Sequence, residues 1–434
     1  MKAGGNIKIF IAIVIFSILI LFHELGHFLL AKKNKIVVEE FSLGMGPRLF
    51  SFTRGTTQYS LKLLPFGGSC MMKGEDGEDE EEGSFNHAPV WGRISVVLAG
   101  PVFNFILAFV LAVIVIGIVG YDPAEIIGFP EDSPAQEAGL LEGDIIKEIN
   151  GSHIDVGREI YNYETFKGLK NEPMTLLIER DGEELEISYQ PYHQTRYMLG
   201  FNYVADNTPA QVTSITLNLP LHKAGVLAGD IITSVDGKKV SSGEELAAYF
   251  DEHPLEDRPV TLTYEREGKE RSAEVTPVRH TNVSLGFYYN MAREKTNLPG
   301  IIKYGAIEVK YWIKTTVQSL GMLVTGKVTV NDMSGPVGVV NVIGDTYEDS
   351  KSEGALITWL SMFNIMILLS ANLGIMNLLP IPALDGGRLV FLVIEAIRGR
   401  GIRRETEGMI HFVGLMLLLA LMVYVTFHDI TRLF

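Results

Sequence analysis

Four long apolar stretches constrain the fold of this 434-residue chain more than any other feature. A helix needs about 20 mostly apolar residues to cross a bilayer. The overall composition, 47% hydrophobic and 21% charged, is typical of soluble proteins, so the distribution of these residues decides the fold class. It predicts a polytopic α-helical membrane protein with four transmembrane helices, which we place in Ile7–Ala31, Val102–Val119, Ala355–Leu379 and Met409–Phe427.

Basic residues near the ends of these stretches predict their orientation. Three lysines lie within 32–35, and five arginines lie within 388–404. Because cytoplasmic loops are enriched in Lys and Arg, we expect 32–90 and 388–408 to be cytoplasmic and 121–354 to be extracytoplasmic. The N-terminus resembles a signal peptide, but no clean small-residue cleavage site follows, so we interpret it as a retained first span.

Charge and cysteine content exclude several classes of protein. The net charge is −15 and no basic patch with interleaved aromatic residues occurs, which argues against nucleic-acid binding. The acidic run Glu75–Glu82 is typical of a solvated loop; a cation site is the alternative, but the ligand spacing of a calcium loop is missing. The single cysteine, Cys70, excludes an intrachain disulfide, and nothing nearby indicates a reactive thiol.

The polar region contains an internal repeat. "SPAQEAGLLEGDIIKEING" at Ser133–Gly151 matches "LPLHKAGVLAGDIITSVDG" at Leu219–Gly237. Each copy predicts a short helix ending at glycine, a β-branched strand and an Asn-Gly or Asp-Gly turn. The pattern resembles PDZ domains of bacterial protease-associated type, which implies two inserted, mainly β (α+β) extracytoplasmic domains. Such domains can bind a peptide as an added strand, or they can act as spacers or size filters; both alternatives stay open.

The first apolar stretch contains "HELGH". His23 and His27 lie one turn apart on the same face of a helix, so their imidazoles can converge on one Zn²⁺, and Glu24 is placed to activate a water molecule. Ionisable side chains at membrane depth are expensive and are functional candidates by default. The pattern therefore predicts a zinc site within the first span.

A catalytic zinc usually takes three protein ligands and keeps one position open. Asp385, in "NLLPIPALDGGRL", follows the third apolar stretch at the same predicted membrane end as the histidines. Pro380 and Pro382 break the helix there, and irregular backbone at membrane depth is tolerated only beside protein or a water-filled cavity. We therefore predict Asp385 as the third ligand.

Together, "HELGH", "LDGG" and the repeated modules between the second and third spans resemble the site-2 protease family of intramembrane zinc metalloproteases, and most closely its RseP-like branch. "AGPVFN" at Ala99–Asn104 resembles the family's G-P-x-x-N at the start of span two, and "SGPVGV" at Ser334–Val339 its S-G-P motif. The resemblance implies a metalloendopeptidase of the bacterial inner membrane. Its expected substrates are transmembrane segments of single-span proteins, such as pre-trimmed anti-sigma factors or signal-peptide remnants, cleaved in regulated intramembrane proteolysis.

Carried over to this sequence, the resemblance implies a role for individual residues. It gives the zinc ligands as His23, His27 and Asp385, the general base as Glu24, and the substrate-contacting positions as Asn372, Asn377, Pro380 and Pro382. It gives Asn104 a structural role. The other histidines lack ligand spacing, which favours surface or packing roles for His87, His153, His193, His222, His253, His280, His411 and His428.

Two further segments carry predictions. Alternating apolar residues around "RGTT" predict a β-hairpin in Arg48–Met72. The resemblance places this hairpin in the membrane near the active site; we hypothesise that its edge, within Gln58–Leu64, holds the substrate as an added strand, and an ordinary cytoplasmic hairpin is the alternative. Gly300–Gly326 predicts an amphipathic helix or helix pair on the outer membrane surface, or else a helix packed on the PDZ region.

The predicted domain organisation has five parts. They are the first half of the protease core at 1–120 with a re-entrant hairpin at about 48–72, PDZ domains at 121–205 and 206–292, amphipathic linker helices at 293–354, and the second half of the core at 355–434. Two rival functions are a non-catalytic scaffold and a membrane-anchored zincin that cuts soluble peptides. The intact motifs argue against the scaffold, and the apolar flanks of "HELGH" argue against the zincin.

Overall fold

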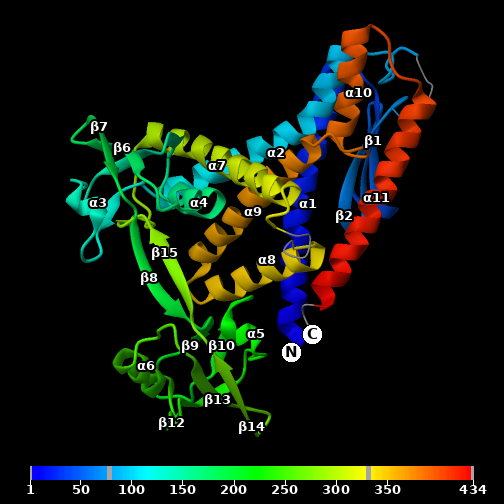
Figure 1. Cartoon of the computed structure of the whole chain (residues 1–434). Coiled ribbons are helices and arrows are strands. Elements are labelled where there is room, and N and C mark those ends of the chain that lie inside the picture. Colours follow the sequence, from blue (N-terminus) through cyan, green and yellow to red (C-terminus); the bar gives the residue numbers. More distant parts are fainter. Residues whose placement is uncertain (1, 76–80, 329–333, 432–434) are drawn as a thin grey trace. The chain divides into compact units, whose positions relative to one another are not determined.

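The computed structural model describes residues 2–75, 81–328 and 334–431. Most of the acidic run at 75–82 therefore lies outside the described residues. The chain divides into two compact units, each discontinuous in sequence (Figure 1). The helical unit comprises Met1–Pro123, Asp155–Phe166 and Met291–Phe434, and the modular unit comprises Ala124–Ile154 and Lys167–Asn290.

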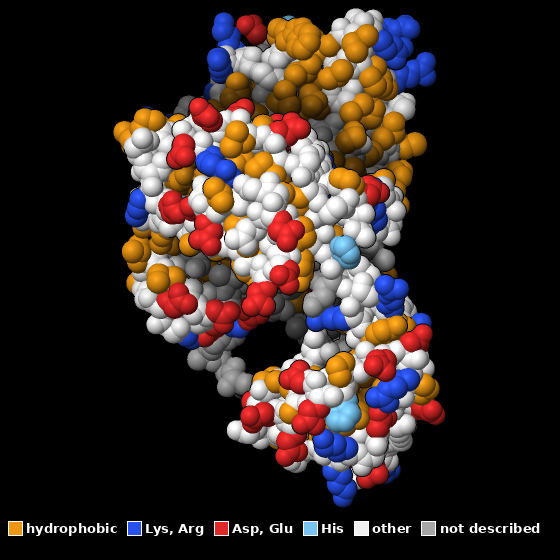
Figure 2. Space-filling view, turned by 60° about the vertical axis from the view of Figure 1, so that its left-hand side comes forward, with side chains coloured by type: hydrophobic (Ala, Val, Ile, Leu, Met, Phe, Trp, Pro, Cys, Tyr) orange, Lys and Arg blue, Asp and Glu red, His pale blue; other side chains and the backbone are white. Residues whose placement is uncertain are grey.

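Four helices of the helical unit are long and apolar enough to cross a membrane, as predicted. They are α1 (Lys2–Lys33), α2 (Val90–Val119), α9 (Ala355–Leu378) and α11 (Arg404–Thr431). Many of their large hydrophobic side chains are exposed. On the face drawn in Figure 2, hydrophobic side chains gather over the helical unit, whereas acidic and basic side chains are spread over the modular unit. Such an apolar exterior suits contact with lipid.

Helix α2 is longer than predicted, because it begins at Val90 rather than Val102. Arg93 lies in its first turns and forms an ion pair with Glu395, with 2.5 Å between Arg93 Nη2 and Glu395 Oε1. This internal pairing explains how the helix accommodates a charge. The expectation that "AGPVFN" marks the start of span two is wrong, because Pro101 lies inside the helix.

Close helix packing depends on glycines in the motifs. A Cβ at Gly26 would overlap the carbonyl of Ala99, so α1 and α2 touch backbone to backbone at this level. Gly374 on α9 similarly packs against the ring of Phe105 on α2. Ser370 Oγ donates a hydrogen bond to the carbonyl of Asn104, at 2.7 Å. Helices α1, α2 and α9 therefore form the tightly packed centre of the helical unit.

The described part of this unit contains four further helices. They are α4 (Arg158–Lys167), α7 (Leu298–Val324), α8 (Pro336–Lys351) and α10 (Asp385–Arg398). The predicted amphipathic segment is one helix, α7, which packs against α2 where Gly305 meets Val113. Arg158 joins this region by ion pairs to Asp122 at 2.5 Å and to Glu308 at 2.9 Å.

A buried carboxylate connects α11 to α8. Asp429, which is 5% exposed, accepts hydrogen bonds from the amides of Gly335 at 3.0 Å and Gly338 at 2.8 Å. These amides lie at the N-terminus of α8, where backbone N–H groups lack partners within the helix and the helix dipole favours negative charge. The predicted "SGPVGV" motif is thus the start of a helix that is capped from α11.

A β-hairpin, β1 (Val38–Arg54) and β2 (Thr57–Met72), follows α1 and confirms the predicted hairpin, although its first strand begins earlier than expected. Both strands are bent. Residues 38–43 pair on one side with 68–72 and on the other side with 58–61. Residues 48–54 complete the sheet by pairing with 57–62. The hairpin therefore has free edges at 68–72 and 48–54, and the predicted edge within Gln58–Leu64 is wrong because 58–61 is paired on both sides.

The modular unit contains two copies of the same small sheet. The first has strand order β5-β4-β6-β7 and the second β12-β11-β13-β14. In the first module the strands and helix are α3 (Pro134–Glu137), β4 (Ile145–Ile149), β5 (Ser152–His153), β6 (Met174–Arg180) and β7 (Glu183–Tyr189). In the second they are α5 (Pro220–Lys223), β11 (Ile231–Val235), β12 (Lys238–Lys239), α6 (Gly243–Glu252), β13 (Val260–Arg266) and β14 (Lys269–Val275).

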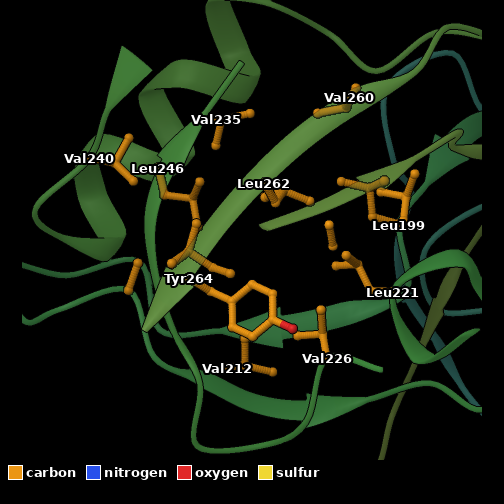
Figure 3. Close-up of a cluster of buried hydrophobic side chains, with 14 of the residues drawn as sticks. Leu199, Val212, Leu221, Val226, Val235, Val240, Leu246, Val260, Leu262 and Tyr264 are labelled. Atoms are coloured by element: carbon orange, nitrogen blue, oxygen red, sulfur yellow. The ribbon is translucent and has the colours of Figure 1, made fainter. Parts of the chain in front are cut away.

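The same buried ion pair recurs in both copies. Arg180 Nε lies 2.6 Å from Asp144 Oδ1, and Arg266 Nε lies 2.6 Å from Asp230 Oδ1. In the second module, hydrophobic side chains of the sheet and helices converge to form its core (Figure 3), among them Leu221, Val235, Leu246, Val260, Leu262 and Tyr264. The repeat seen in the sequence is therefore a repeat of structure.

The second module is inserted into the first. The strands that flank it, β8 (Tyr192–Met198) and β15 (Val278–Ser284), pair as an antiparallel ribbon. After this ribbon, β16 (Tyr288–Tyr289) returns to pair with β3 (Ile126–Gly128) of the first module. In the second module, by contrast, the corresponding short pair is formed by strands of that module alone, β9 (Phe201–Tyr203) and β10 (Val212–Ile215). The chain thus completes the first module only after the second.

Candidate metal centre

The two histidines of "HELGH" lie on the face of α1 that packs against α2. Both are buried, with 8% of each residue exposed. A Cβ at Gly100 of α2 would meet His27 Nε2 and would lie 2.6 Å from His23 Cε1. The absent side chain of Gly100 therefore leaves the space in which the two imidazoles point toward each other.

The third predicted ligand meets both imidazoles. Asp385 Oδ2 lies 3.1 Å from His23 Nε2 and 3.5 Å from His27 Nε2, and the two Nε2 atoms are 3.2 Å apart. Tetrahedral ligands bonded to zinc at about 2.0–2.1 Å stand about 3.3 Å from one another. All three separations are close to that value. Among the described residues, Asp385 Oδ2 is buried without a hydrogen-bond partner, which also fits an atom that coordinates a metal.

The outer nitrogens of the imidazoles are held by neighbouring groups of α2. His27 Nδ1 lies 2.9 Å from the carbonyl oxygen of Val96. Because a carbonyl only accepts, Nδ1 carries the proton and the lone pair of Nε2 is free for a metal. His23 Nδ1 lies 3.1 Å from the Asn104 amide nitrogen, and Asn104 Oδ1 is buried without a partner among the described residues. A half-turn of this amide would let Oδ1 accept from His23 Nδ1. Asn104 therefore contacts a candidate ligand directly.

A tight loop delivers Asp385 to this position. Helix α9 ends at Leu378 and α10 begins at Asp385, so the helix break predicted at Pro380 and Pro382 is confirmed. Gly386 and Gly387 are buried, and a Cβ on either would overlap backbone carbonyls of the loop. The "LDGG" glycines thus let α10 fold back closely on the preceding turn.

Glu24 lies between the histidines in sequence and faces the hairpin. A Cβ on Gly68 of β2 would lie 3.1 Å from Glu24 Cγ. The edge of the hairpin at 68–72 therefore borders the candidate general base. Burial raises the pKa of the Cys70 thiol, which agrees with the prediction that this cysteine is unreactive.

The four predicted substrate-contacting residues lie at the end of α9 and in the loop after it. Asn372 is half-buried and its Oδ1 accepts a hydrogen bond from Thr316 of α7. Asn377 is half-buried in the last turn of α9 and Pro380 is exposed. Pro382 packs against Gly414 of α11, where a Cβ would lie 2.5 Å from Pro382 Cβ. Their contact with a substrate stays a prediction.

Comparison with known proteins identifies the family. The model of peptidase family M50 matches residues 11–421, nearly the whole chain. The chain belongs to peptidase family M50. This M50 peptidase is a zinc metalloprotease and a multi-pass membrane protein, as the sequence predicted.

Curated relatives align with this chain over nearly their full lengths. The zinc metalloprotease RasP of Geobacillus kaustophilus is 33% identical, with 97% of each chain covered. The regulator of sigma-W protease RasP of Bacillus subtilis is 31% identical, with 97% of this chain and 98% of the relative covered. The probable protease eep of Enterococcus faecalis is 30% identical at the same coverage.

Proposed function

We propose that this M50 peptidase cleaves transmembrane segments inside the membrane, with zinc held by His23, His27 and Asp385. The observation that carries the proposal is the meeting of these three side chains at coordination spacing, on a helix that is apolar enough to span a bilayer. Zinc bound by these residues supplies a Lewis acid that polarises a peptide carbonyl and lowers the pKa of an attacking water toward about 7.

Glu24 is the proposed general base. It takes the proton of the attacking water and passes it to the leaving amine. The hairpin strand at Gly68 packs closely against this side chain beside the metal centre. The substrate helix must unwind to expose a carbonyl, which costs a few kcal/mol because the freed backbone groups lose their partners. We assign Asn372, Asn377 and the loop of Pro380 and Pro382 to contacts that offset this cost.

Glu24→Gln tests the assignment of the base. The substitution keeps the size of the side chain and should preserve fold and zinc content, while cleavage of a reconstituted single-span substrate falls by about 10²–10⁴-fold. Zinc content and thermal unfolding in detergent are the controls. Undiminished cleavage in Glu24→Gln would falsify the role of Glu24.

The substrate strand, in this proposal, adds to the hairpin edge at 68–72, because this edge borders Glu24. Strand addition to a sheet edge gives backbone hydrogen bonds to an extended peptide. At Met72 the added strand would replace the hydrogen bond that this amide donates to Glu75 Oε2, at 3.4 Å. Two exposed side chains on opposite edges form a matched pair: Met71 is 49% exposed and Phe52 is 53% exposed. In the Glu24→Gln background, a photo-crosslinker at Met71 should capture the substrate and one at Phe52 should not. Equal capture at both positions would remove the edge hypothesis.

The biological setting follows the sequence predictions. We propose a bacterial inner-membrane enzyme with the metal centre near the cytoplasmic side. The repeated modules are proposed to be extracytoplasmic PDZ domains, with the second inserted into the first because β16 returns to pair with β3. The expected substrates are single-span proteins trimmed by another protease; the name of the Bacillus subtilis relative, regulator of sigma-W protease, supports anti-sigma factors as one class. Proteomic comparison of wild type with Glu24→Gln should show membrane fragments accumulating in the variant.

A further inference from the structure

The loop that carries Asp385 is bonded to α11 by a histidine that sequence reasoning gave an ordinary packing role. The backbone N–H of Ala383 donates to His411 Nδ1, at 2.8 Å. On the other side of the ring, His411 Nε2 lies 3.9 Å from a carboxylate oxygen of Glu407, one turn earlier on α11. This arrangement fits a neutral ring with the proton on Nε2 and the lone pair of Nδ1 directed at the loop.

Ala383 has an unusual backbone conformation. Its φ is +77°, in the left-handed region, which costs a non-glycine residue about 1–2 kcal/mol. Such a conformation persists only where the surrounding structure holds it. Within the loop, the Leu384 N–H donates to the carbonyl of Ile381 at 3.2 Å and closes a turn around Pro382 and Ala383. The hydrogen bond from Ala383 to His411 holds this turn from outside the loop.

Two other contacts fix α11 against the same loop. Gly414, one turn after His411, allows Pro382 to approach its backbone closely. The ring of His411 also packs edge-on against Phe391 of α10, with 5.4 Å between ring centroids. His411 therefore touches both the loop before Asp385 and the helix that begins at Asp385, while lying on a separate membrane helix.

We propose that His411 is a positioning residue for the metal centre: its Nδ1 fixes the turn around Ala383 against α11 and so directs the Asp385 carboxylate toward His23 and His27. This inference rests on the proposed role of Asp385 as a zinc ligand. Groups that orient metal ligands from outside the coordination sphere typically contribute 10–100-fold in metal affinity.

Isosteric substitutions test whether Nδ1 of His411 is the atom that positions the loop. The Oδ1 of asparagine can occupy the place of His Nδ1 and accept from Ala383, whereas the Oε1 of glutamine occupies the place of Nε2. We expect His411→Gln and His411→Leu in the full-length protein to weaken zinc affinity about tenfold, and His411→Asn to stay within about threefold of wild type. Zinc affinity is measured by chelator competition in detergent, and cleavage by the weakened variants should recover in excess zinc.

A second variant tests the role of the backbone. Glycine adopts positive φ without strain, so adding Ala383→Gly to His411→Leu should restore part of the lost zinc affinity. His428→Leu removes another histidine of α11 and is the matched control; it should leave zinc affinity unchanged.

Asp385→Ala separates failure of this inference from failure of the proposed function. If Asp385→Ala keeps wild-type zinc affinity, Asp385 is not a ligand and the proposed function fails. If Asp385→Ala loses zinc while His411→Gln and His411→Leu retain it, only the positioning role fails. Equal losses in the Asn, Gln and Leu variants of His411 would also overturn the positioning role, because acceptor placement would then be irrelevant.

Discussion

The candidate metal centre and the modular unit bury polar side chains in different ways. In the modules, Asp144 and Asp230 are each 1% exposed and fully paired with an arginine. In the helical unit, His23, His27 and Asp385 face one another, and an oxygen of Asp385 has no hydrogen-bond partner among the described residues. Buried polar groups that are satisfied stabilise a fold, whereas a buried group left unsatisfied indicates a bound species or a chemical role. The paired aspartates therefore stabilise the modules, whereas His23, His27 and Asp385 form a site for chemistry.

Excision of the second module should give the largest of the predicted effects, a change in the rate at which untrimmed substrate is cleaved. Met198 and Val278 are paired neighbours across the β8–β15 ribbon, so a short glycine-serine linker can replace 199–277. If the second module excludes untrimmed substrates, its removal should raise their cleavage about tenfold or more. This corresponds to a loss of about 1.4 kcal/mol or more in the discrimination between trimmed and untrimmed substrates. Rates on trimmed and untrimmed substrates measure this.

Zinc content is the control for the excision, and it should not change. Unchanged selectivity between the two substrates would instead show that the second module is a passive spacer.

The paired aspartates should affect stability without affecting the metal. Asp230→Asn removes the charge that bonds Arg266 and should lower the unfolding free energy of the second module by about 2–3 kcal/mol. Hydrogen exchange of β11 and β13 measures this loss. Asp144→Asn is the matched variant and should destabilise the first module alone. A loss of bound zinc in either variant would contradict the separation of the two units.

Asp429 offers a buried carboxylate in the helical unit whose role is structural. Asp429→Asn keeps the shape of the cap but removes the charge at the N-terminus of α8, so the expected loss is about 1 kcal/mol. The amide of Gly338 should exchange faster, while zinc affinity remains near that of wild type. An exchange rate equal to wild type would show that charge contributes nothing there.

Acid should have the smallest effect on the second module among these changes. Burial by itself raises the pKa of Asp230, but hydrogen bonds from Arg266 and from the Leu227 amide outweigh it and hold the pKa below its ordinary value. The stability that this carboxylate contributes is therefore present above its unfolded pKa of about 4 and is lost as pH falls through the lower folded value. Hydrogen exchange between about pH 5 and pH 2 should show this loss, and Asp230→Asn should flatten it.

Much of the candidate site could be predicted because its information is local. The spacing of His23 and His27 fixes them on one face of α1, and the four apolar stretches determine which helices span the membrane. The repeated "GD" motifs predicted two similar modules. The turn of the hairpin also follows from adjacent residues, Gly55 and Thr56.

The remaining features depend on contacts between distant residues. The charge of Arg93 in the early turns of α2 is paired by Glu395, which lies on another helix. The hairpin folds back at glycines with positive φ, such as Gly44 and Gly67, and this determines which edge is free. The contact of His411 with Ala383 joins two helices, and no local pattern around the histidine indicates it.

The cap of α8 has a consequence for biogenesis. Asp429 lies 94 positions after the first amide that it accepts from, and the loop before Asp385 is likewise bonded to a helix made later. While the ribosome is still synthesising α11, the nascent protease therefore has neither a capped α8 nor a braced aspartate loop. Release of the polypeptide before His411 should yield a product that inserts its earlier spans but retains its metal poorly, because the contact of His411 with the loop before Asp385 is then missing.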